Sequence, residues 1–530
     1  MNNGMKSERV SALLKKGVAR RSSDSQVVMQ VARVAALSAL SALVTLSACG
    51  GGGGSSSSTS TPIATTPDTS SGSGSTPPSG TANAAFNGTV LLGAPEDTRL
   101  RVKLHSDTQS GTVQLSWGLA SVDESRSTAA TLVAGEPLEL RVEGLQPDSA
   151  YRWRLAFTPT GAAGATNSPE YRWRTARRKG STFTFTIQAD SHLDENSDAD
   201  IYRRTLDNIL VSSPDFHIDL GDTFMTEKHS DALTALVLPA STQSIVNARY
   251  VLERGYFGRV THSVPLFLAN GNHDAELGWL YNGVADSLPV WATKARQRYF
   301  LNPMPGAFYS GDLNVEPYTG ERAAWYAWTW GDALFVVLDP FWNSKASANK
   351  DAWSMTLGER QYRWLEALLQ SSTATHKFIF LHNLVGGLDG QMRGGIEAAP
   401  YYEWGGRNAD GTAGFATKRA GWTAPIHDLL VKNRVTAVFH GHDHFYARQV
   451  LDGVVYQLVP QPSAKNSSNA TTLASDYRYA SGTFVGSSGH LRVTVSPSQV
   501  TTEYVRTWLP MAENATQVNG QVADRWVITR

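Results

Sequence analysis

The sequence predicts an α/β body preceded by a smaller all-β domain. Beyond residue 181, short apolar segments with the pattern of buried strands alternate with segments of helical periodicity, as in α/β bodies. Residues 84–177 instead alternate polar and apolar side chains at period two, between turn-rich segments, which is typical of antiparallel strands. A chain of 530 residues is long enough for two such units.

The charge balance gives no sign of a function that depends on strong net charge. Lys and Arg together number 47, as do Asp and Glu, so the formal net charge is zero. Binding to nucleic acid or to an anionic membrane surface usually involves an excess of basic residues. We therefore expect no specific nucleic-acid binding.

The N-terminal segment predicts export and lipid attachment. After a basic stretch, Val34–Ala48 is an apolar run of signal-peptide length, too short to span a bilayer comfortably. Leu46-Ser47-Ala48-Cys49 resembles a bacterial lipoprotein lipobox, which implies removal of residues 1–48 and a lipid on Cys49 that holds the protein to the membrane. This predicts a lipid-anchored protein of the bacterial cell envelope, in the outer membrane or facing the periplasm. A plain secretory signal that contains a cysteine is the alternative.

Residues 49–83 are predicted to be a flexible tether. A glycine run is followed there by Ser, Thr and Pro, and this composition buries too little apolar surface to offset the entropy of the chain. Cys49 is the only cysteine in the sequence, so no intramolecular disulfide can form in spite of the oxidising compartment.

The all-β domain is assigned to residues 84–177. Strands are expected at Thr98–Leu104, Thr112–Trp117, Pro137–Val142 and Tyr151–Phe157. Leu145-Gln146-Pro147 followed by Tyr151 resembles the tyrosine corner of β-sandwiches, and the segment from Tyr171 resembles the closing strand of a fibronectin type III-like sandwich. The domain has no cluster of His, Cys or carboxylates, so we expect a spacer or packing role, with a carbohydrate- or protein-binding module as the alternative. Arg177–Gly180 is expected to be an exposed linker.

In the α/β body, six predicted strands each end in a carboxylate, an amide or an imidazole. The strands and the groups that follow them are Thr182–Gln188 with Asp190-Ser191-His192, Phe216–Leu220 with Gly221-Asp222, Val264–Ala269 with Gly271-Asn272-His273-Asp274, Ala333–Leu338 with Asp339, Lys377–Leu381 with His382, and Val435–Phe439 with His440-Gly441-His442-Asp443-His444. Ligands of α/β bodies gather beyond the carboxyl ends of the strands, and imidazole is the commonest metal ligand. We therefore predict a metal site, with Gly441 permitting the sharp turn beside two of its histidines. Taken singly, each motif is also compatible with a polar loop that closes a strand.

In this order, Asp-x-His, Gly-Asp, Gly-Asn-His-Asp, His and Gly-His-x-His form the signature of the calcineurin-like metallophosphoesterases, which residues 181–530 resemble. The resemblance implies a four-layer fold, in which a β-sandwich is flanked by helices. It also implies two metal ions. The implied ligands are Asp190, His192 and His444 for one ion, Asn272, His382 and His442 for the other, and Asp222 as the bridge between them. Mn, Fe or Zn suit such mixed oxygen and imidazole ligands.

The resemblance implies hydrolysis of phosphate mono- or diesters by a water activated between the two ions, on a phosphorylated small molecule or a nucleotide. His273 is expected to be a catalytic residue that stabilises or protonates the leaving group, with Asp274 orienting its ring. The alternative is a cell-surface binding lipoprotein that acts through its β-sandwich, with a vestigial or structural metal site.

Some positions depart from the family pattern or remain open. Met225 stands where the purple acid phosphatase branch has a tyrosine ligand, so a purple Fe(III) site is not expected. His382 lies in a less typical context, and His376, before the same strand, is its competitor. Arg393 is the candidate for binding substrate phosphate, because a guanidinium matches phosphate bidentately; a solvated loop arginine is the alternative.

The remaining segments are predicted to support the body. Helices are expected at Ala199–Ser212 and Gln361–Gln370, the second opened by a capping box at Thr356–Glu359. Strands at Val454–Val459, His490–Val495 and Thr501–Thr507 are expected to complete the catalytic sandwich. Lys465–Thr483 is expected to be a polar surface loop.

Overall fold

The computed structural model describes residues 85–194, 196–226, 242–345, 352–386, 393–465 and 470–530. Pro78–Arg530 form one compact unit. The predicted signal peptide, the lipid-attachment site at Cys49 and the tether lie outside the described residues. Within the described ranges, no helix is long and apolar enough to cross a membrane.

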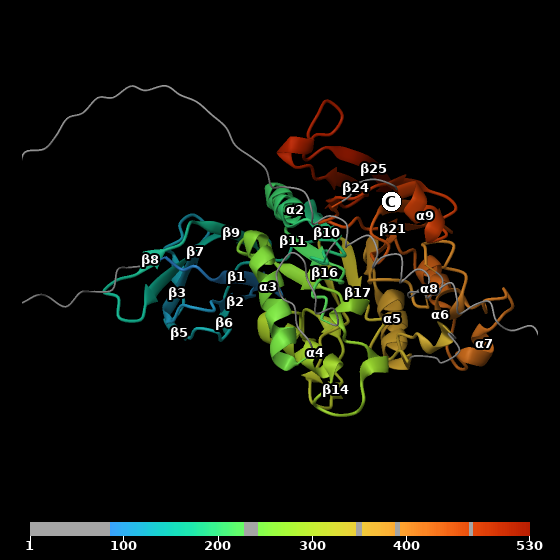
Figure 1. The fold of residues 1–530 in the computed structure, drawn as a ribbon, viewed down its shortest axis with the longest axis horizontal. Helices are drawn as coiled ribbons and strands as arrows, with labels where there is room; N and C mark the ends of the chain where they lie inside the picture. Colours follow the sequence, from blue (N-terminus) through green and yellow to red (C-terminus); the bar gives the residue numbers. More distant parts are fainter. Residues whose placement is uncertain (1–84, 195, 227–241, 346–351, 387–392, 466–469) are drawn as a thin grey trace, which may run out of the picture. The chain divides into compact units, whose positions relative to one another are not determined.

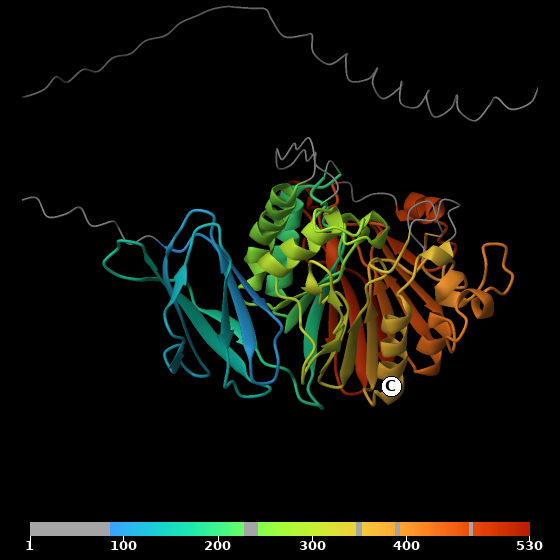
Figure 2. The ribbon, with the colours of Figure 1, turned by 90° about the horizontal axis from the view of Figure 1, so that it is seen from below.

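Two large β-sheets form the centre of this unit (Figure 1 and Figure 2). The first has nine strands, in the order β25 (Val522–Thr529), β24 (Gln499–Arg506), β23 (Gly489–Val495), β10 (Phe183–Gln188), β11 (Phe216–Asp219), β12 (Leu266–Leu268), β1 (Thr89–Gly93), β2 (Leu100–His105) and β6 (Leu138–Val142). The second has eight, in the order β13 (Ser310–Gly311), β16 (Tyr326–Trp330), β17 (Ala333–Val337), β18 (His376–Phe380), β19 (Ala437–His440), β21 (Val454–Leu458), β20 (Tyr446–Leu451) and β22 (Thr483–Val485).

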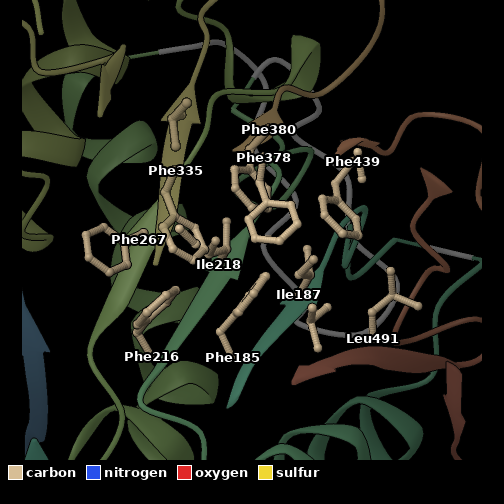
Figure 3. Close-up of a cluster of buried hydrophobic side chains, with 14 of the residues drawn as sticks. Phe185, Ile187, Phe216, Ile218, Phe267, Phe335, Phe378, Phe380, Phe439 and Leu491 are labelled. Atoms are coloured by element: carbon tan, nitrogen blue, oxygen red, sulfur yellow. The ribbon is translucent and has the colours of Figure 1, made fainter. Parts of the chain in front are cut away.

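Phenylalanine is the commonest residue in the core between the two sheets. Figure 3 shows Phe185, Ile187, Phe216, Ile218 and Phe267 of the first sheet facing Phe335, Phe378, Phe380 and Phe439 of the second. Side chains of a strand point to opposite faces in turn, so the residues between these, such as Val336, Ile379 and Val438, pack on the outer face. Both faces of the second sheet are therefore apolar, which is why its strands have continuous apolar sequences.

Helices cover the outer faces of both sheets. Against the first sheet pack α2 (Ala199–Val211), α3 (Gln243–Thr261) and α4 (Leu288–Tyr299). Against the second pack α5 (Glu359–Ser371) and α8 (Ile426–Lys432). Shorter helices are α6 (Tyr402–Gly405), α7 (Phe415–Lys418) and α9 (Ala470–Asp476). The predicted α/β class, with a sandwich flanked by helices, is confirmed.

The N-terminal β-region forms a sandwich with its own core, in which Leu92 and Val102 pack with Leu115, Trp153 and Phe157. One sheet is β1, β2 and β6; the other comprises β3 (Gly111–Gly118), β4 (Ser125–Arg126), β5 (Ala130–Leu132), β7 (Ala150–Pro159), β8 (Thr166–Asn167) and β9 (Tyr171–Arg174). The Tyr151 hydroxyl accepts a hydrogen bond of 2.7 Å from the backbone N–H of Gln146, as the tyrosine-corner pattern predicted.

Two features of this region differ from the sequence-based expectation. β1 pairs in parallel with β12, so one sheet of the sandwich continues the first sheet of the body. In the linker, Arg177 makes a bidentate ion pair with Asp215, at 2.6 and 3.0 Å, and is therefore anchored where full exposure was expected.

The C-terminal strands take the predicted places. β21 lies in the second sheet, and β23 and β24 extend the first, so they complete the sandwich of the body. The segment before β22 is more ordered than the predicted surface loop, because it contains α9 and the buried Tyr479. The aromatic segment Trp325–Trp330 is part of the buried β16 strand and its flank.

Candidate metal centre

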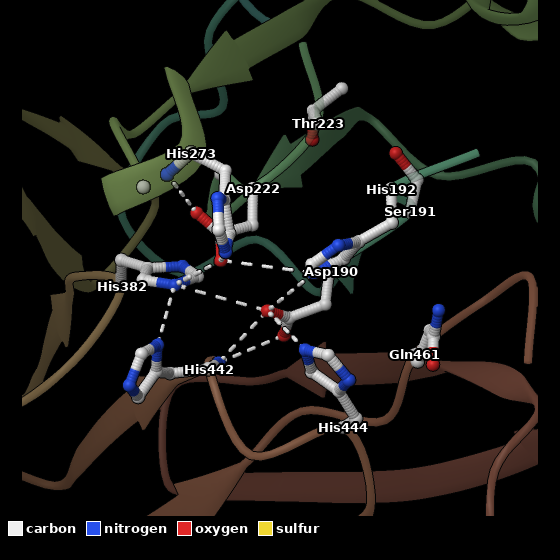
Figure 4. Close-up of polar contacts among 12 residues, drawn as sticks. Asp190, Ser191, His192, Asp222, Thr223, His273, His382, His442, His444 and Gln461 are labelled. Atoms are coloured by element: carbon white, nitrogen blue, oxygen red, sulfur yellow. Dashed lines mark hydrogen bonds and ion pairs between the residues drawn. The ribbon is translucent and has the colours of Figure 1, made fainter. Parts of the chain in front are cut away.

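The polar strand ends of both sheets meet at one edge of the body (Figure 4). In the first sheet, Gln188 lies beside Asp219, and Asp219 lies beside Leu268, so the loops that follow β10, β11 and β12 are neighbours. In the second sheet, Phe380 lies beside Phe439, which places His382 next to the loop after β19. Each sheet thus supplies part of one cluster of carboxylates and imidazoles.

The ligand loops have unusual backbone conformations. The φ angles of five candidate ligands are positive: Asp190 (63°), His192 (54°), Asp222 (55°), His442 (81°) and His444 (64°). Non-glycine residues adopt this left-handed region rarely, and such strain is found mostly at functional sites. Hydrogen bonds between the loops hold it, including one from the Asp190 N–H to the Gly221 carbonyl at 2.9 Å.

Two glycines allow the loops to approach each other. A Cβ on Gly221, whose φ is +90°, would lie 2.1 Å from the backbone nitrogen of Gly271. Gly441 was expected to make the turn before His442, but the positive φ angles belong to His442 and His444. Its actual role is to leave room, because a Cβ there would lie 2.7 Å from Oδ2 of Asp190.

The first ligand group consists of Asp190, His192 and His444. Oδ1 of Asp190 lies 3.7 Å from Nε2 of His192 and 3.6 Å from Nε2 of His444. Nδ1 of His192 lies 3.5 Å from Oδ2 of Asp194. Such an outer carboxylate orients a histidine, so that Nε2 faces the site.

The second ligand group consists of Asp222, His382 and His442. Nε2 of His382 lies 3.1 Å from Oδ2 of Asp222 and 3.3 Å from Nδ1 of His442. Nδ1 of His382 lies 2.9 Å from the Leu220 carbonyl, which leaves Nε2 to the site. His376, its competitor, is at the opposite end of β18 and contacts the Ser496 carbonyl at 3.0 Å.

Asp222 lies between the two groups. Its Oδ2 is 3.1 Å from His382 of one group and 3.7 Å from Nε2 of His192 in the other, a position suited to a bridging carboxylate. Within the described part of the chain, Oδ1 of Asn272 and Nε2 of His192 are buried and have no hydrogen-bond partner. Buried polar atoms are rarely left unsatisfied, so the donor set fits two metal ions.

In the metal-free protein, protons occupy part of this site. Burial by itself would lower the pKa of His192, but the nearby carboxylates of Asp190 and Asp194 raise it to about 10. Burial would likewise lower the pKa of His382, but the negative charge of Asp222 outweighs this effect and raises it to about 9. Burial would raise the pKa of Asp222, yet His382 and His273 hold it well below its usual value. A metal ion would have to displace these protons.

His273 lies beside both ligand groups. Its side chain is 18% exposed, and its Nε2 is 3.9 Å from Oδ2 of Asp222. Its ring centre is 5.4 Å from that of His192. The backbone N–H of His273 donates to Oδ1 of Asp222 at 2.7 Å, which fixes the short helical turn η1 (Asn272–Asp274) against the site.

Asp274 has a different role from the expected orientation of the His273 ring. Its carboxylate accepts hydrogen bonds from four backbone N–H groups at 2.7–3.1 Å. The donors are Gly271, Asp222, Thr223 and Phe224. Burial and the charge of Asp222 raise its pKa to about 7. Asp274 therefore braces the loops that carry Asp222 and Asn272.

Arg393 is also engaged differently from the predicted phosphate contact. Its Nε donates to Oδ1 of Asp443 at 2.6 Å, and its Nη2 donates to the His442 carbonyl at 2.6 Å. The guanidinium carbon lies 4.0 Å from the ring centre of Tyr477. This arginine holds the last ligand loop, and a phosphate would have to compete with that ion pair.

The sequence did not single out three residues that support the ligands. Asp194 could have been found from the spacing Asp-x-His-x-Asp, which places a carboxylate two residues after His192. Ser463 donates to the Ser191 carbonyl at 2.6 Å, and Tyr479 donates to Asp443 at 2.9 Å. No local pattern marks these two, because their partners are 272 and 36 residues away.

The four-layer body carries two histidine and carboxylate groups at its strand ends. A family model for calcineurin-like phosphoesterases matches residues 183–446, and this match together with the two ligand groups indicates a metal-dependent phosphoesterase. The match ends at Tyr446, two residues after the last ligand.

Two solved structures resemble the chain in fold. PhoD superimposes with a TM-score of 0.59 at 14% identity, covering 84% of this chain and 91% of that one. Purple acid phosphatase PPD1 from yellow lupin (Lupinus luteus) seeds gives 0.52 at 14% identity, with 83% and 74% covered. No curated protein sequence matches the chain.

Proposed function

We propose that the enzyme hydrolyses phosphate mono- or diesters of small molecules or nucleotides at the edge where the two sheets meet. The single observation that carries this is the geometry of Asp222. Its Oδ2 lies between His192 and His382, which belong to different ligand groups, and is 3.9 Å from Nε2 of His273. The name of the lupin neighbour, a phosphatase, supports the same reaction class.

The side chains have separable tasks in this reaction. Asp190, His192 and His444 would hold one metal ion, and His382 and His442 the other, with Asp222 between them. The buried, unsatisfied Oδ1 of Asn272 would complete the second set. When bound at this site, such ions would offer positive charge to phosphate oxygens and would lower the pKa of a water molecule. His273 stands outside both groups, and its partly exposed side chain is placed to donate a proton or a hydrogen bond to the leaving oxygen.

The experiment compares the full-length protein with His273→Ala. Metal content is measured first, and then hydrolysis of p-nitrophenyl phosphate and of bis-p-nitrophenyl phosphate. We expect two bound ions in both proteins and a loss of about 10²–10⁴-fold in kcat for the variant, the usual contribution of a general acid. Fewer than two ions in the wild type, or equal activity in both proteins, would contradict the proposal.

We also propose that the chain is a lipoprotein of the bacterial envelope and that the β-sandwich separates the catalytic body from the membrane. The basis is the lipobox-like Leu46-Ser47-Ala48-Cys49 and the glycine-rich segment behind it. Mass spectrometry of the N-terminal peptide should find an acylated Cys49. A Cys49→Ser variant that stays in the membrane fraction to the same extent would argue against the lipid anchor.

A further inference from the structure

Asp443, the residue between the last two ligands, directs its carboxylate away from both ligand groups. The side chain is almost fully buried and is held by two other segments of the chain. Oδ1 accepts from Nε of Arg393 at 2.6 Å; Oδ2 accepts from the Tyr479 hydroxyl at 2.9 Å and from the Gly394 N–H at 3.3 Å. Both oxygens are thus occupied, and Asp443 belongs to neither ligand group.

The turn around Asp443 needs such restraint. His442 and His444 both have left-handed backbones, with φ of 81° and 64°. Strained backbones of this kind persist only where surrounding contacts determine them. The His442 carbonyl accepts from Arg393, the His444 carbonyl accepts from Ser487 at 2.7 Å, and the His442 N–H donates to Asp190 at 2.9 Å. Arg393 therefore holds both the carboxylate and the backbone of the turn.

The conformation of this turn determines how the two ligand groups are spaced. His442 faces His382 in one group, and His444 faces Asp190 in the other. We infer that Asp443 is a positioning residue: with Arg393 and Tyr479, it locks the strained turn so that its two imidazoles serve two metal ions at once. The inference rests on the proposed two-metal function, but its test needs no turnover.

The chain offers a matched control in Glu397. This carboxylate accepts from Gln449 at 2.8 Å, from the Ala480 N–H at 2.9 Å and from the Ser481 N–H at 3.2 Å. It thus connects the same two chain segments as the Asp443 cluster, yet within the described residues its hydrogen bonds do not reach the turn of His442 and His444. Glu397→Gln reports what loosening of these segments does without release of the turn.

The experiment titrates Mn²⁺ into the metal-free full-length protein by calorimetry, with thermal unfolding of the same samples as the test of folding. Asp443→Asn keeps the shape but weakens the charge-assisted bonds, and we expect Mn²⁺ affinity to fall about 10–100-fold at both sites, as is usual for partners of metal ligands. Tyr479→Phe keeps the ring packing and should produce a smaller loss at both sites. His442→Ala should affect mainly one site, and Glu397→Gln neither.

Unchanged Mn²⁺ affinity in a folded Asp443→Asn protein would overturn the inference. So would an equal loss in Glu397→Gln, because the effect would then come from the segments and not from the turn. If Asp443→Asn does not fold, Tyr479→Phe decides by the same criterion. A wild-type protein that binds two ions but hydrolyses no phosphoester would refute the proposed function and leave this inference standing.

Discussion

Gly441 shows at the scale of one residue how closely the ligand loops are packed. The space that a side chain would fill is taken by the Asp190 carboxylate and by the Ala189 methyl group, both 2.7 Å from an added Cβ. Asp190 in turn accepts the His442 N–H with both oxygens, at 3.1 and 2.9 Å. The metal centre therefore requires a glycine at position 441.

Gly441→Ala should damage this site more than the fold. Forcing a methyl group into filled space costs about 1–3 kcal/mol, and here it would push the Asp190 carboxylate from its place. We expect weaker Mn²⁺ binding and a lower melting temperature. Gly255 in α3 is the control, since an added Cβ there meets nothing within 4 Å. Gly255→Ala should be stabilising by about 0.5–1 kcal/mol, and equal Mn²⁺ affinity in the two variants would contradict the prediction.

The residue types at the strand ends could be predicted, but their partners could not. Asp190, Asp222 and His382 each follow an apolar run, and that pattern is local. The positions of Arg393 and Tyr479 around Asp443 depend on contacts 50 and 36 residues away. Asp274 follows His273 directly, which favoured a contact between their side chains, whereas its carboxylate satisfies backbone N–H groups of a neighbouring loop.

At the scale of elements, period-two alternation and short apolar runs located the strands, and local signals were less reliable at helix ends. α5 begins at Glu359 after Gly358, whose φ is 78°, so the expected capping box is absent from the described contacts of this helix. The Thr356 hydroxyl instead donates to Glu403, which lies 47 residues away. The Thr356 side chain thus contacts a residue distant in sequence, and the local sequence could not predict this contact.

The polar outer face of β10, β11 and β23 predicts acid sensitivity. His217 on β11 and His490 on β23 are fully buried. Nδ1 of His217 contacts the Thr186 hydroxyl at 2.9 Å. Burial lowers the pKa of each histidine to about 3 from a usual 6.5, and the positive charge of Arg492 adds to the lowering of the pKa of His490. Below pH 6.5 these histidines therefore bind protons in the unfolded chain but not in the folded chain. The free energy of unfolding is fully retained above pH 6.5 and falls as the pH drops towards 3.

Each of these histidines should contribute a slope of about 1.4 kcal/mol per pH unit in that window. His490→Leu removes one of them. Chemical denaturation of wild type and variant between pH 7 and pH 4 should show a shallower loss of stability for the variant. Parallel pH profiles would mean that His490 is not a source of the acid sensitivity.

At the scale of the whole molecule, the β-sandwich is attached to the body by more than a linker. Besides the pairing of β1 with β12, the buried Arg254 donates to the Thr89 hydroxyl at 2.7 Å, and Lys103 donates to the Phe300 carbonyl at 2.9 Å. Trp153 donates to the His262 carbonyl at 3.1 Å. The two regions share buried polar contacts as well as a sheet.

Removal of the sandwich should therefore destabilise the catalytic body. A fragment of residues 181–530 would leave Arg254 without its acceptors on the removed strands and would expose the edge of β12, and each unsatisfied buried group costs about 1–3 kcal/mol. We expect a lower melting temperature and poorer solubility than for residues 78–530. Equal melting temperatures would show that the sandwich is energetically independent.

The division of the ligands between the two sheets has a mechanical consequence. Asp190, His192, Asp222 and Asn272 follow strands of the first sheet, whereas His382, His442 and His444 follow strands of the second. Any ion held by both sets is a cross-link between the halves of the sandwich, and binding to the folded state alone adds about 2.7 kcal/mol of stability at a hundredfold excess over Kd. Chelation should accordingly lower the melting temperature and speed amide exchange at the ligand-bearing ends of both sheets, while their opposite ends stay protected. Uniform exchange along the strands would show that the ions do not fasten the sheets together. Because each ligand group draws on both sheets, opening of the sandwich would separate the ligands of each ion.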